Sequence, residues 1–367
     1  MPDCTIRPAY PELPRDHGFE TTIVIRHFLE MRRRLKKSLF VAILAVLVLI
    51  PVISLEALKV STAAERHKIA KADVEEMLKS LSNWGRWGKE DQRGALNLIT
   101  SEERTQAAAL VKSGVSVSLS HNAITERIGN SAPFEHHMVQ TGVMAETDSA
   151  TDIYSVQYHG FTQTHLDALC HLFYGGQMYN GFSRQDVTDK GAATLSVINI
   201  KTGIFTRGIL MDFPRLFGTK YLKGDQAIYP EDLDAWEKKT GLKVQSGDAV
   251  FIRTGRWARR QAEGEWDMRT GSAGLHVSCM PWFKKRDISV LASDLVSDVM
   301  PSGVDGFRMP VHLVTIYAMG VPILDNCDLE AISEYSDAHR RCDFLLTLAP
   351  LAVEGGTGSP VNPIATF

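Results

Sequence analysis

Cysteine is scarce in this sequence, and no two cysteines stand in the C-x-x-C spacing. The five that are present are scattered over 367 residues, so a disulfide framework is not indicated. Phosphate-binding fingerprints of the G-x-G-x-x-G or G-K-[ST] type are missing, which leaves no sequence evidence for a nucleotide site. Internal repeats and low-complexity tracts are also absent from the sequence.

Charge of either sign is not in large excess. The net charge of -3, and the lack of interleaved basic and aromatic residues, argue against a general nucleic-acid binder. The composition is that of an ordinary soluble globular protein, and the chain is long enough to bury a core without covalent staples. We therefore expect a small-molecule partner and no nucleic acid.

A long apolar run lies near the start of the chain, at residues 39–53. A basic segment at residues 31–37 precedes it and small residues follow at 61–64, which is the order found in secretory signals. The run is shorter than the ~20 residues of a full membrane span, so cleavage and anchoring both remain open.

The first thirty residues contain four prolines and no clear periodicity. We interpret residues 1–30 as disordered, or as a mis-assigned start, because a chain beginning at Met31 would have a conventional signal peptide. The sequence then predicts a signal peptide or signal-anchor at 31–64 and a folded domain at 65–367. This domain would be exported to the periplasm or the outside, or be anchored in the membrane through residues 39–53 alone.

The segment His159-Gly160-Phe161-Thr162-Gln163-Thr164-His165-Leu166-Asp167-Ala168-Leu169-Cys170-His171 carries most of the chemistry. It follows residues 153–158, which read as a strand; if this strand continues, alternate side chains share one face. The residues on that face would be His159, Gln163, His165 and Asp167. A helical turn after Asp167 would bring His171 back over its carboxylate.

Imidazole and carboxylate together form a ligand set for a divalent transition metal, and a further histidine can shuttle protons for metal-bound water. Histidines that lie near one another are more often structural or surface groups, and two histidines with one aspartate are an incomplete ligand set. A metal site therefore requires a second cluster elsewhere in the chain. Cys170, inside the motif, is interpreted as a buried packing residue, with a nucleophilic or ligand role as the alternative.

The motif resembles the signature His-x-Gly-Thr-His-x-Asp-x-Pro-x-His of the cyclase-like metal hydrolase family, which includes bacterial kynurenine formamidases and isatin hydrolases. The resemblance extends from residues 84–88 to residues 355–360. It implies that His165 and Asp167 bind the metal and that His171 acts in proton transfer. The family's first motif histidine falls at Phe161 here, so His159 or Gln163 would replace it, or the site would hold one metal instead of two, or hold it weakly.

The same resemblance supplies the second cluster. In the family, a histidine on a helix and an acidic residue at the end of the following strand complete the metal site. His312 matches the histidine, ahead of a predicted helix at 313–319 and a strand at 321–324. Asp325 stands where the family usually has Glu, after a stretch that is one residue longer.

The remaining pattern is a mixture of strands and helices. Strands are predicted at 115–119, 208–212, 249–253 and 288–292, and helices from Asp73 to about Asn83, at 100–112 and at 230–241. Residues 122–150 are predicted to be a loop, in which His136 or His137 is a weak candidate for substrate contact and surface histidines are the favoured interpretation. We expect a mixed α/β domain, resembling the swivelling β/β/α fold of the family.

The predicted activity is hydrolysis of an amide, formamide or lactam by metal-activated water, with zinc or manganese as the cofactor. Two alternatives remain: an extracytoplasmic small-molecule binding protein on the same fold without turnover, and a metal-dependent dehydratase or cyclase. The resemblance also implies a homodimer.

Overall fold

The computed structural model describes residues 67–129, 131–144 and 147–367. The predicted disordered segment at 1–30 and the predicted signal segment at 31–64 lie outside the described residues. Within the described ranges, none of the helices combines the length and the apolar character that crossing a bilayer requires. Residues Ile69–Phe367 form one compact unit.

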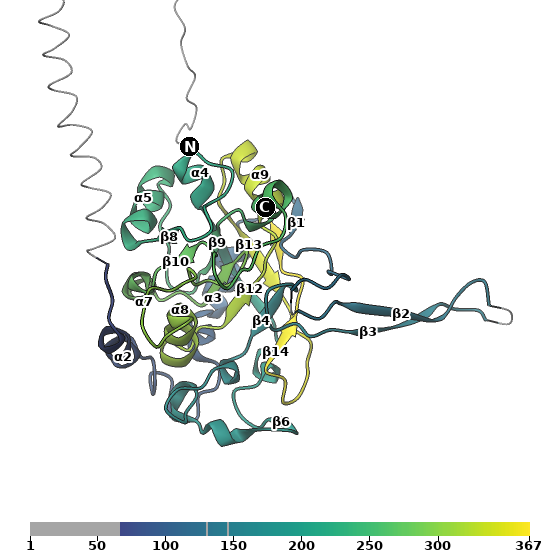
Figure 1. Cartoon of the computed structure of the whole chain (residues 1–367), viewed down its shortest axis with the longest axis horizontal. Helices are drawn as coiled ribbons and strands as arrows, with labels where there is room; N and C mark the ends of the chain where they lie inside the picture. The colour runs from purple at the N-terminus through teal and green to yellow at the C-terminus, as the bar shows by residue number, and fades with distance from the viewer. Residues whose placement is uncertain (1–66, 130, 145–146) are drawn as a thin grey trace, which may run out of the picture. The chain divides into compact units, whose positions relative to one another are not determined.

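A nine-stranded mixed sheet runs through this unit, in the order β1-β15-β13-β7-β9-β11-β12-β4-β14 (Figure 1). The four strands β7, β9, β11 and β12 are parallel, and the other pairings are antiparallel. Their bounds are β1 Ser116–Ser118, β15 Ile364–Thr366, β13 Asp343–Leu348, β7 Ile204–Asp212, β9 Ala249–Arg253, β11 Val290–Ser293, β12 Ile323–Asp325, β4 His165–Asp167 and β14 Gly358–Pro360. The predicted mixed α/β fold is confirmed.

Helices and short two-stranded sheets surround the large sheet (Figure 1). The α-helices are α2 Lys71–Ser80, α3 Ser101–Ala108, α4 Phe213–Phe217, α5 Pro230–Thr240, α6 Arg256–Glu263, α7 Met280–Arg286, α8 Pro310–His312 and α9 Glu330–His339. The 3-10 helices are η1 Gly94–Leu98, η2 Leu169–His171, η3 Tyr179–Gly181, η4 Arg184–Asp186, η5 Val197–Ile200 and η6 Val277–Cys279, and η7 Leu313–Ala318 is a π-helix. The two-stranded sheets pair β2 Glu135–Gln140 with β3 Thr151–Ser155, β8 Ala227–Ile228 with β10 Gly274–Leu275, and β5 Val187–Thr188 with β6 Gly191–Ala192.

Apolar side chains alternate between the two faces of the central strands, because successive residues of a strand point to opposite sides. One face packs against α2, α5, α7 and the α8–η7 segment, and we call it the first core cluster; it includes Ile252, Leu291 and Ile323. The other face, the second core cluster, includes Phe251 and Leu324 and packs against α9. Both faces of the central strands are thus buried, as parallel strands require.

Several element boundaries follow from caps that the sequence shows. Pro230 begins α5 and Gly241, in a left-handed conformation, ends it, as predicted. Thr100 caps α3 by accepting a hydrogen bond from the Glu103 amide, although the helix ends at Ala108 and not near residue 112. The first predicted helix begins before Asp73, because this residue occupies the third helical position and its carboxylate accepts a hydrogen bond from the Ala70 amide at 2.7 Å.

The prediction of a loop at residues 122–150 is wrong over part of its length. Strands β2 and β3 form a hairpin that projects from the body of the unit (Figure 1). Its residues are exposed on both faces, so the apolar–polar alternation that marks a half-buried strand has no reason to be present. The strand predicted at 153–158 ends at Ser155, so it does not continue into the motif.

Two glycines allow the segment between η7 and β12 to pack closely against the rest of the unit. Gly320 has φ +63°, its carbonyl accepts a hydrogen bond from the Ala95 amide at 2.8 Å, and a Cβ added to it would lie 2.3 Å from the Tyr179 ring. Gly94 faces it, and a Cβ there would lie 2.1 Å from the Gly320 carbonyl oxygen. This contact fixes the turn that joins His312 to Asp325.

We expect Gly320→Ala to lower the free energy of unfolding by about 3 kcal/mol, because a left-handed backbone and an overpacked ring contact are both penalised. Gly85→Ala is the matched control: Gly85 has φ +74° but open space around its Cβ position, so the expected cost is about 1 kcal/mol. Urea unfolding of the two variants measures both values. Equal losses would show that ring contact at Gly320 contributes nothing.

Candidate metal centre

The pairing of β4 with β12 brings the two predicted clusters together. In this antiparallel pair, His165 lies opposite Asp325 and Asp167 lies opposite Ile323. Residues opposite each other on paired strands share a face, so His165, Asp167 and Asp325 project to the same side, while Leu166 enters the second core cluster. All three polar residues are at most 3 % exposed.

His312 reaches the same point from α8. Its Nε2 lies 3.1 Å from Asp325 Oδ2, and the residue is 2 % exposed. The side chains of His165, Asp167, His312 and Asp325 therefore meet although their positions in the chain are far apart. One face of β4, the last residue of β12 and the end of α8 together position them.

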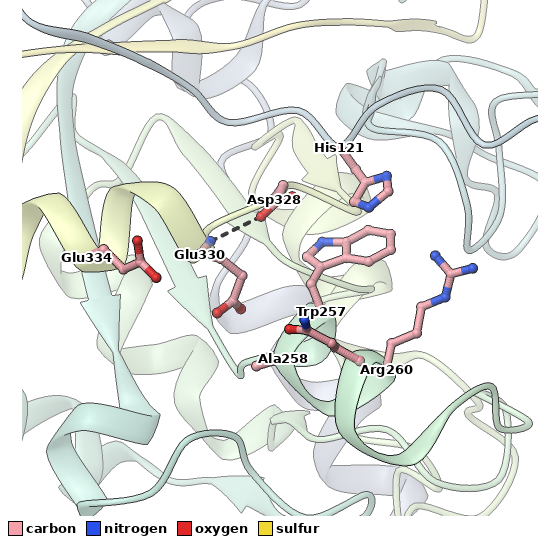
Figure 2. A pocket seen from close by; sticks show the side chains of 8 residues that line it. His121, Trp257, Ala258, Arg260, Asp328, Glu330 and Glu334 are labelled. Carbon is pink, nitrogen blue, oxygen red and sulfur yellow. Dashed lines mark hydrogen bonds between the residues drawn. The ribbon is translucent and has the colours of Figure 1, made fainter.

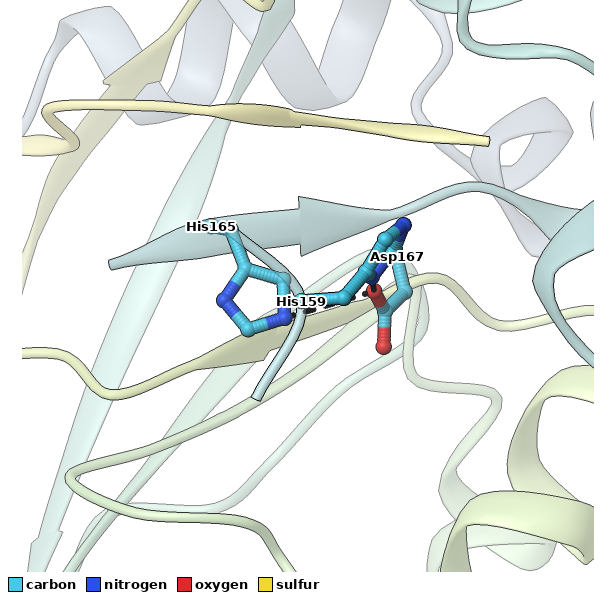
Figure 3. A group of neighbouring side chains, drawn as sticks. All are labelled: His159, His165 and Asp167. Atoms are coloured by element: carbon cyan, nitrogen blue, oxygen red, sulfur yellow. Dashed lines mark ion pairs between the residues drawn. The ribbon is translucent and has the colours of Figure 1, made fainter. Parts of the chain in front are cut away.

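His159 joins the group from the loop between β3 and β4 (Figure 3). Its Nδ1 lies 2.9 Å from Asp167 Oδ1, and His165 Nε2 lies 3.5 Å from the same oxygen. Gly358 of β14 makes room for this ring, because a Cβ at Gly358 would come within 3.1 Å of His159 Cε1. His159 therefore lies in the cluster, as the sequence suggested. It reaches the cluster from a loop, and not from a strand that continues through the motif.

Each of these three histidines has its other ring nitrogen engaged in a hydrogen bond. His159 Nε2 lies 2.9 Å from Thr357 Oγ1, and His165 Nδ1 donates to the Gln163 carbonyl at 2.8 Å. His312 Nδ1 lies 2.7 Å from Asp298 Oδ2. Such partners fix ring orientation and tautomer, which is the arrangement found around histidines that bind metals.

Several atoms that face the centre of the cluster are left without a hydrogen bond. Within the described part of the chain, this holds for His159 Nδ1, Asp167 Oδ1 and Asp325 Oδ1, all of which are buried. The first two lie close together, but their geometry is not that of a hydrogen bond. Buried polar atoms without partners are rare and costly, so the cluster is complete only when another species satisfies them.

A divalent cation fits this requirement. The ligand atoms of His159, His165 and Asp167 lie within 4.8 Å of one another, and those of Asp167, His312 and Asp325 do so as well. The two sets overlap at Asp167, and together they offer imidazole nitrogens and carboxylate oxygens, the mixed donors that transition metals accept. The residues present therefore fit the metal that the resemblance implies.

Burial and nearby opposite charges shift the pKa values of the cluster residues in opposite directions. Burial would raise the pKa of Asp167, but the neighbouring His171, His165 and His159 outweigh it and hold the pKa below its usual range. Burial raises the pKa of Asp325, with His312 opposing. Burial would lower the pKa of His312, but Asp325 and Asp298 raise it well above its ordinary value.

His171 stands at the edge of the cluster. The 3-10 turn η2 brings its Nε2 to 3.8 Å from Asp167 Oδ2, and its ring stacks on His159 with centroids 4.1 Å apart. Burial lowers the pKa of His171 to about 4, with Asp167 opposing, so this imidazole is neutral at pH 7. Its side chain is 27 % exposed, which leaves it accessible to a reactant.

Four residues that the sequence singled out do not join the cluster. The amide of Gln163 is occupied by the backbone of Ile124, with contacts of 3.0 and 3.3 Å. Cys170 is fully buried, and burial raises its thiol pKa to about 12, which fits a packing role. His136 and His137 lie on the exposed β2–β3 hairpin, and His136 Nε2 pairs with Asp152 at 2.9 Å.

Sequence reasoning missed Asp298 and Thr357, which hold His312 and His159 in place. Asp298 is 1 % exposed, and its carboxylate also accepts hydrogen bonds from the amides of Val311 and His312 at 2.7 and 3.1 Å. The sequence gives little indication of this role. Asp298 lies five residues beyond the apolar strand β11, and no recognisable spacing links it to His312. Thr357 lay within the glycine-rich segment, but nothing in its sequence context indicated a histidine partner.

A separate cavity of about 490 Å³ lies between α6 and the start of α9 (Figure 2). His121, stacked on Trp257 at 3.8 Å, and the acidic side chains of Asp328, Glu330 and Glu334 line it, and none of the clustered residues does. Glu330 is paired with Arg253 at 2.7 Å. The unsatisfied ligand atoms described above are thus at the cluster and not in this cavity.

Comparisons with known proteins agree with the resemblance in the motif. The family model for putative cyclases matches residues 117–298. A crystal structure described as a novel cyclase is 29 % identical, with a TM-score of 0.71 over 78 % of this chain and 100 % of that one. A search of curated proteins gives no match.

Two isatin hydrolases share the fold. Isatin hydrolase A from Ralstonia solanacearum is 18 % identical, with a TM-score of 0.50 over 68 % of this chain and 91 % of that one. Isatin hydrolase A from Labrenzia aggregata, bound to benzyl benzoate, is 19 % identical, with a TM-score of 0.51 over 71 % and 94 %. The matched model, the similar cyclase structure and the motif around His165 show that the chain is similar to proteins of the cyclase family.

Proposed function

We propose that this protein is a metal-dependent hydrolase that cleaves an amide, formamide or lactam. The proposal rests on the geometry of three histidines, His159, His165 and His312. In each ring, one nitrogen is held by a hydrogen bond outside the cluster. The other nitrogen points at the carboxylate of Asp167 or Asp325. The similar isatin hydrolases support the bond type, because isatin is a cyclic amide.

The residues that would hold the cation are His159, His165, Asp167, His312 and Asp325. When bound, a divalent metal polarises a carbonyl group and makes water acidic enough to ionise near neutral pH. Zinc or manganese suits these mixed nitrogen and oxygen donors.

His171 has the position and the charge state of the general base. It is neutral at pH 7, is partly open to solvent and lies beside Asp167, so its imidazole can accept a proton from the attacking water. The same imidazolium then donates that proton to the leaving nitrogen. Asp167, held ionised by the surrounding histidines, stabilises the charged form of His171 during the transfer.

The segment at residues 31–64 supports a further proposal, that the enzyme is exported or membrane-anchored and acts outside the cytoplasm. The family resemblance supports a homodimer. Neither proposal affects the chemistry described above.

Asp167→Asn should reduce metal affinity by about 10-fold or more, because an amide oxygen is a weaker ligand than a carboxylate. Elemental analysis of the purified protein, together with hydrolysis of N-formylkynurenine, measures the loss. Asp152→Asn, on the exposed hairpin, is the matched control and should leave both values unchanged. Unaltered metal content in Asp167→Asn would remove this residue from the ligands.

His171→Gln should keep the metal and lose turnover, because glutamine preserves polarity but cannot exchange a proton. General acid–base catalysis predicts a fall in kcat of about 100- to 10,000-fold. His136→Gln serves as the control for loss of a histidine outside the cluster. A kcat within about 3-fold of wild type, against that range, would exclude His171 as the base. Product analysis of the same reactions separates hydrolysis from a dehydratase or cyclase reaction.

Metal binding should release a proton. In the metal-free protein the raised pKa keeps His312 protonated at pH 7, so a cation that binds its Nε2 must displace that proton. Metal affinity should therefore rise with pH until the pKa of His312 is passed. Titration calorimetry in buffers of different ionisation enthalpy measures the number of protons released.

Asp298→Asn tests the origin of this effect. The variant removes one of the two carboxylates that raise the pKa of His312, so proton release at pH 7 should decrease. Metal affinity should also fall by about 10- to 100-fold, since the ring loses its orienting partner. Affinity that is independent of pH in the wild type would contradict the assignment of His312 as a ligand.

A further inference from the structure

Asn326 is a buried polar residue that the mechanism above does not use. It directly follows Asp325 at the end of β12, is fully buried, and has a left-handed backbone with φ +56°. Among residues other than glycine, asparagine and aspartate adopt this conformation most readily. The backbone alone would explain an asparagine at this position, but it does not explain the contacts of the side chain.

The amide of Asn326 holds the loop that carries His159. Its Nδ2 donates hydrogen bonds to the Gly160 carbonyl at 2.8 Å and to the Gln163 carbonyl at 3.2 Å. Gly160 directly follows His159 in the chain. The Gln163 carbonyl also accepts the hydrogen bond from His165 Nδ1, at 2.8 Å. One side-chain amide thus contacts the backbone next to His159 and the group that orients His165.

Arg256 fixes the direction in which this amide points. Its Nη1 donates to Asn326 Oδ1 at 2.7 Å, and its Nη2 donates to the Phe161 carbonyl of the same loop. A guanidinium group can only donate, so the oxygen of the Asn326 amide faces Arg256 and the nitrogen faces the loop. The backbone carbonyl of Asn326 accepts a hydrogen bond from Thr164 Oγ1 at 2.7 Å, which joins the far end of the loop to the same residue.

These contacts connect the two halves of the proposed ligand set. His159 and His165 lie at the two ends of the loop, and Asp325 lies next to Asn326 on β12. Buried carbonyls that lose a donor are costly, so removal of the Asn326 amide favours a loop that moves away from β12. The distances between the loop histidines and Asp325 would change with it.

We propose that Asn326 is a positioning residue for the metal centre: its amide holds His159 and His165 where they can share a cation with the ligands from β12 and α8. It acts through these histidines and is not a ligand itself, since its oxygen is occupied by Arg256. The inference rests on the proposed metal-dependent function, but its readout is metal affinity, which does not require turnover.

The test compares Asn326→Gly with Asn180→Gly. Glycine keeps a left-handed backbone and removes only the side chain. Asn180 is the matched control, because it has φ +60° and its Nδ2 donates to three backbone carbonyls of residues 88–91, away from the cluster. Only Asn326→Gly should bind Zn²⁺ or Mn²⁺ more weakly, by about 10- to 100-fold, in a competition titration against a chelator. Equal affinities of the two variants would overturn the proposal.

Asn326→Asp is a second variant, which guards against misfolding of the glycine variant. Aspartate has nearly the same shape and keeps an acceptor for Arg256, but it places an oxygen against the two loop carbonyls in place of a donor. Its metal affinity should also fall by about 10-fold or more. An affinity equal to that of the wild type would show that the donor is not required.

A double-mutant cycle with His159→Gln shows whether Asn326 acts through a ligand. If it does, adding Asn326→Gly to His159→Gln should cost at least about 3-fold less in metal affinity than adding it to the wild type, because residues that act as a unit are not additive. A residue that only stabilises the fold would cause equal losses in both backgrounds, and this result would overturn the proposal.

Hydrolysis is measured separately on the same samples, with N-formylkynurenine, isatin and acetanilide as a formamide, a cyclic amide and an open amide. If the wild type binds the cation without turnover and Asn326→Gly shows the expected loss and coupling, the hydrolase proposal fails and the positioning role stands. If the wild type hydrolyses a substrate but Asn326→Gly and Asn180→Gly bind the cation equally well, the positioning role is refuted and the hydrolase proposal stands.

Discussion

The register between β4 and β12 is the constraint on which the site depends. It places His165 opposite Asp325, so that ligand candidates separated by 160 positions share one face of the sheet. A slip of one residue would turn His165 and Asp167 into the second core cluster and bring Leu166 to the centre, because side chains alternate along a strand. The apolar partners Leu166 and Leu324 hold the register from the other face, where both are fully buried.

Electrostatic balance is the second requirement, since the cluster buries three carboxylates, those of Asp167, Asp298 and Asp325. Ionised groups are buried only when they are paired or bind a cation. In the metal-free protein a proton on His312 supplies part of this compensation, and a divalent cation supplies more. A proton and a metal ion therefore compete for the ring nitrogen of His312 that faces the cluster. The hydrogen bonds to the other ring nitrogens of the histidines hold the rings in the same orientation in both states.

The sequence predicted the elements whose signals are local. Strand β9 and helix α5 have the expected bounds, because an apolar run and a Pro/Gly pair mark them. It did not predict the exposed β2–β3 hairpin, which lacks a buried face. Nor did it predict the role of Asp298, which depends on how the segment after β11 lies against the backbone of α8. The family resemblance predicted that His312 and Asp325 lie in one site. Only the structure showed that His159 is carried by a loop.

Anomalous diffraction from crystals of the metal-loaded protein, recorded at the absorption edge of the bound metal, tests the central claim most directly. The account predicts a single strong peak, or two adjacent peaks that share Asp167, within coordination distance of His165 Nε2, the Asp167 carboxylate and His312 Nε2. A peak elsewhere on the molecule, with these side chains still hydrogen-bonded only to one another, would contradict it.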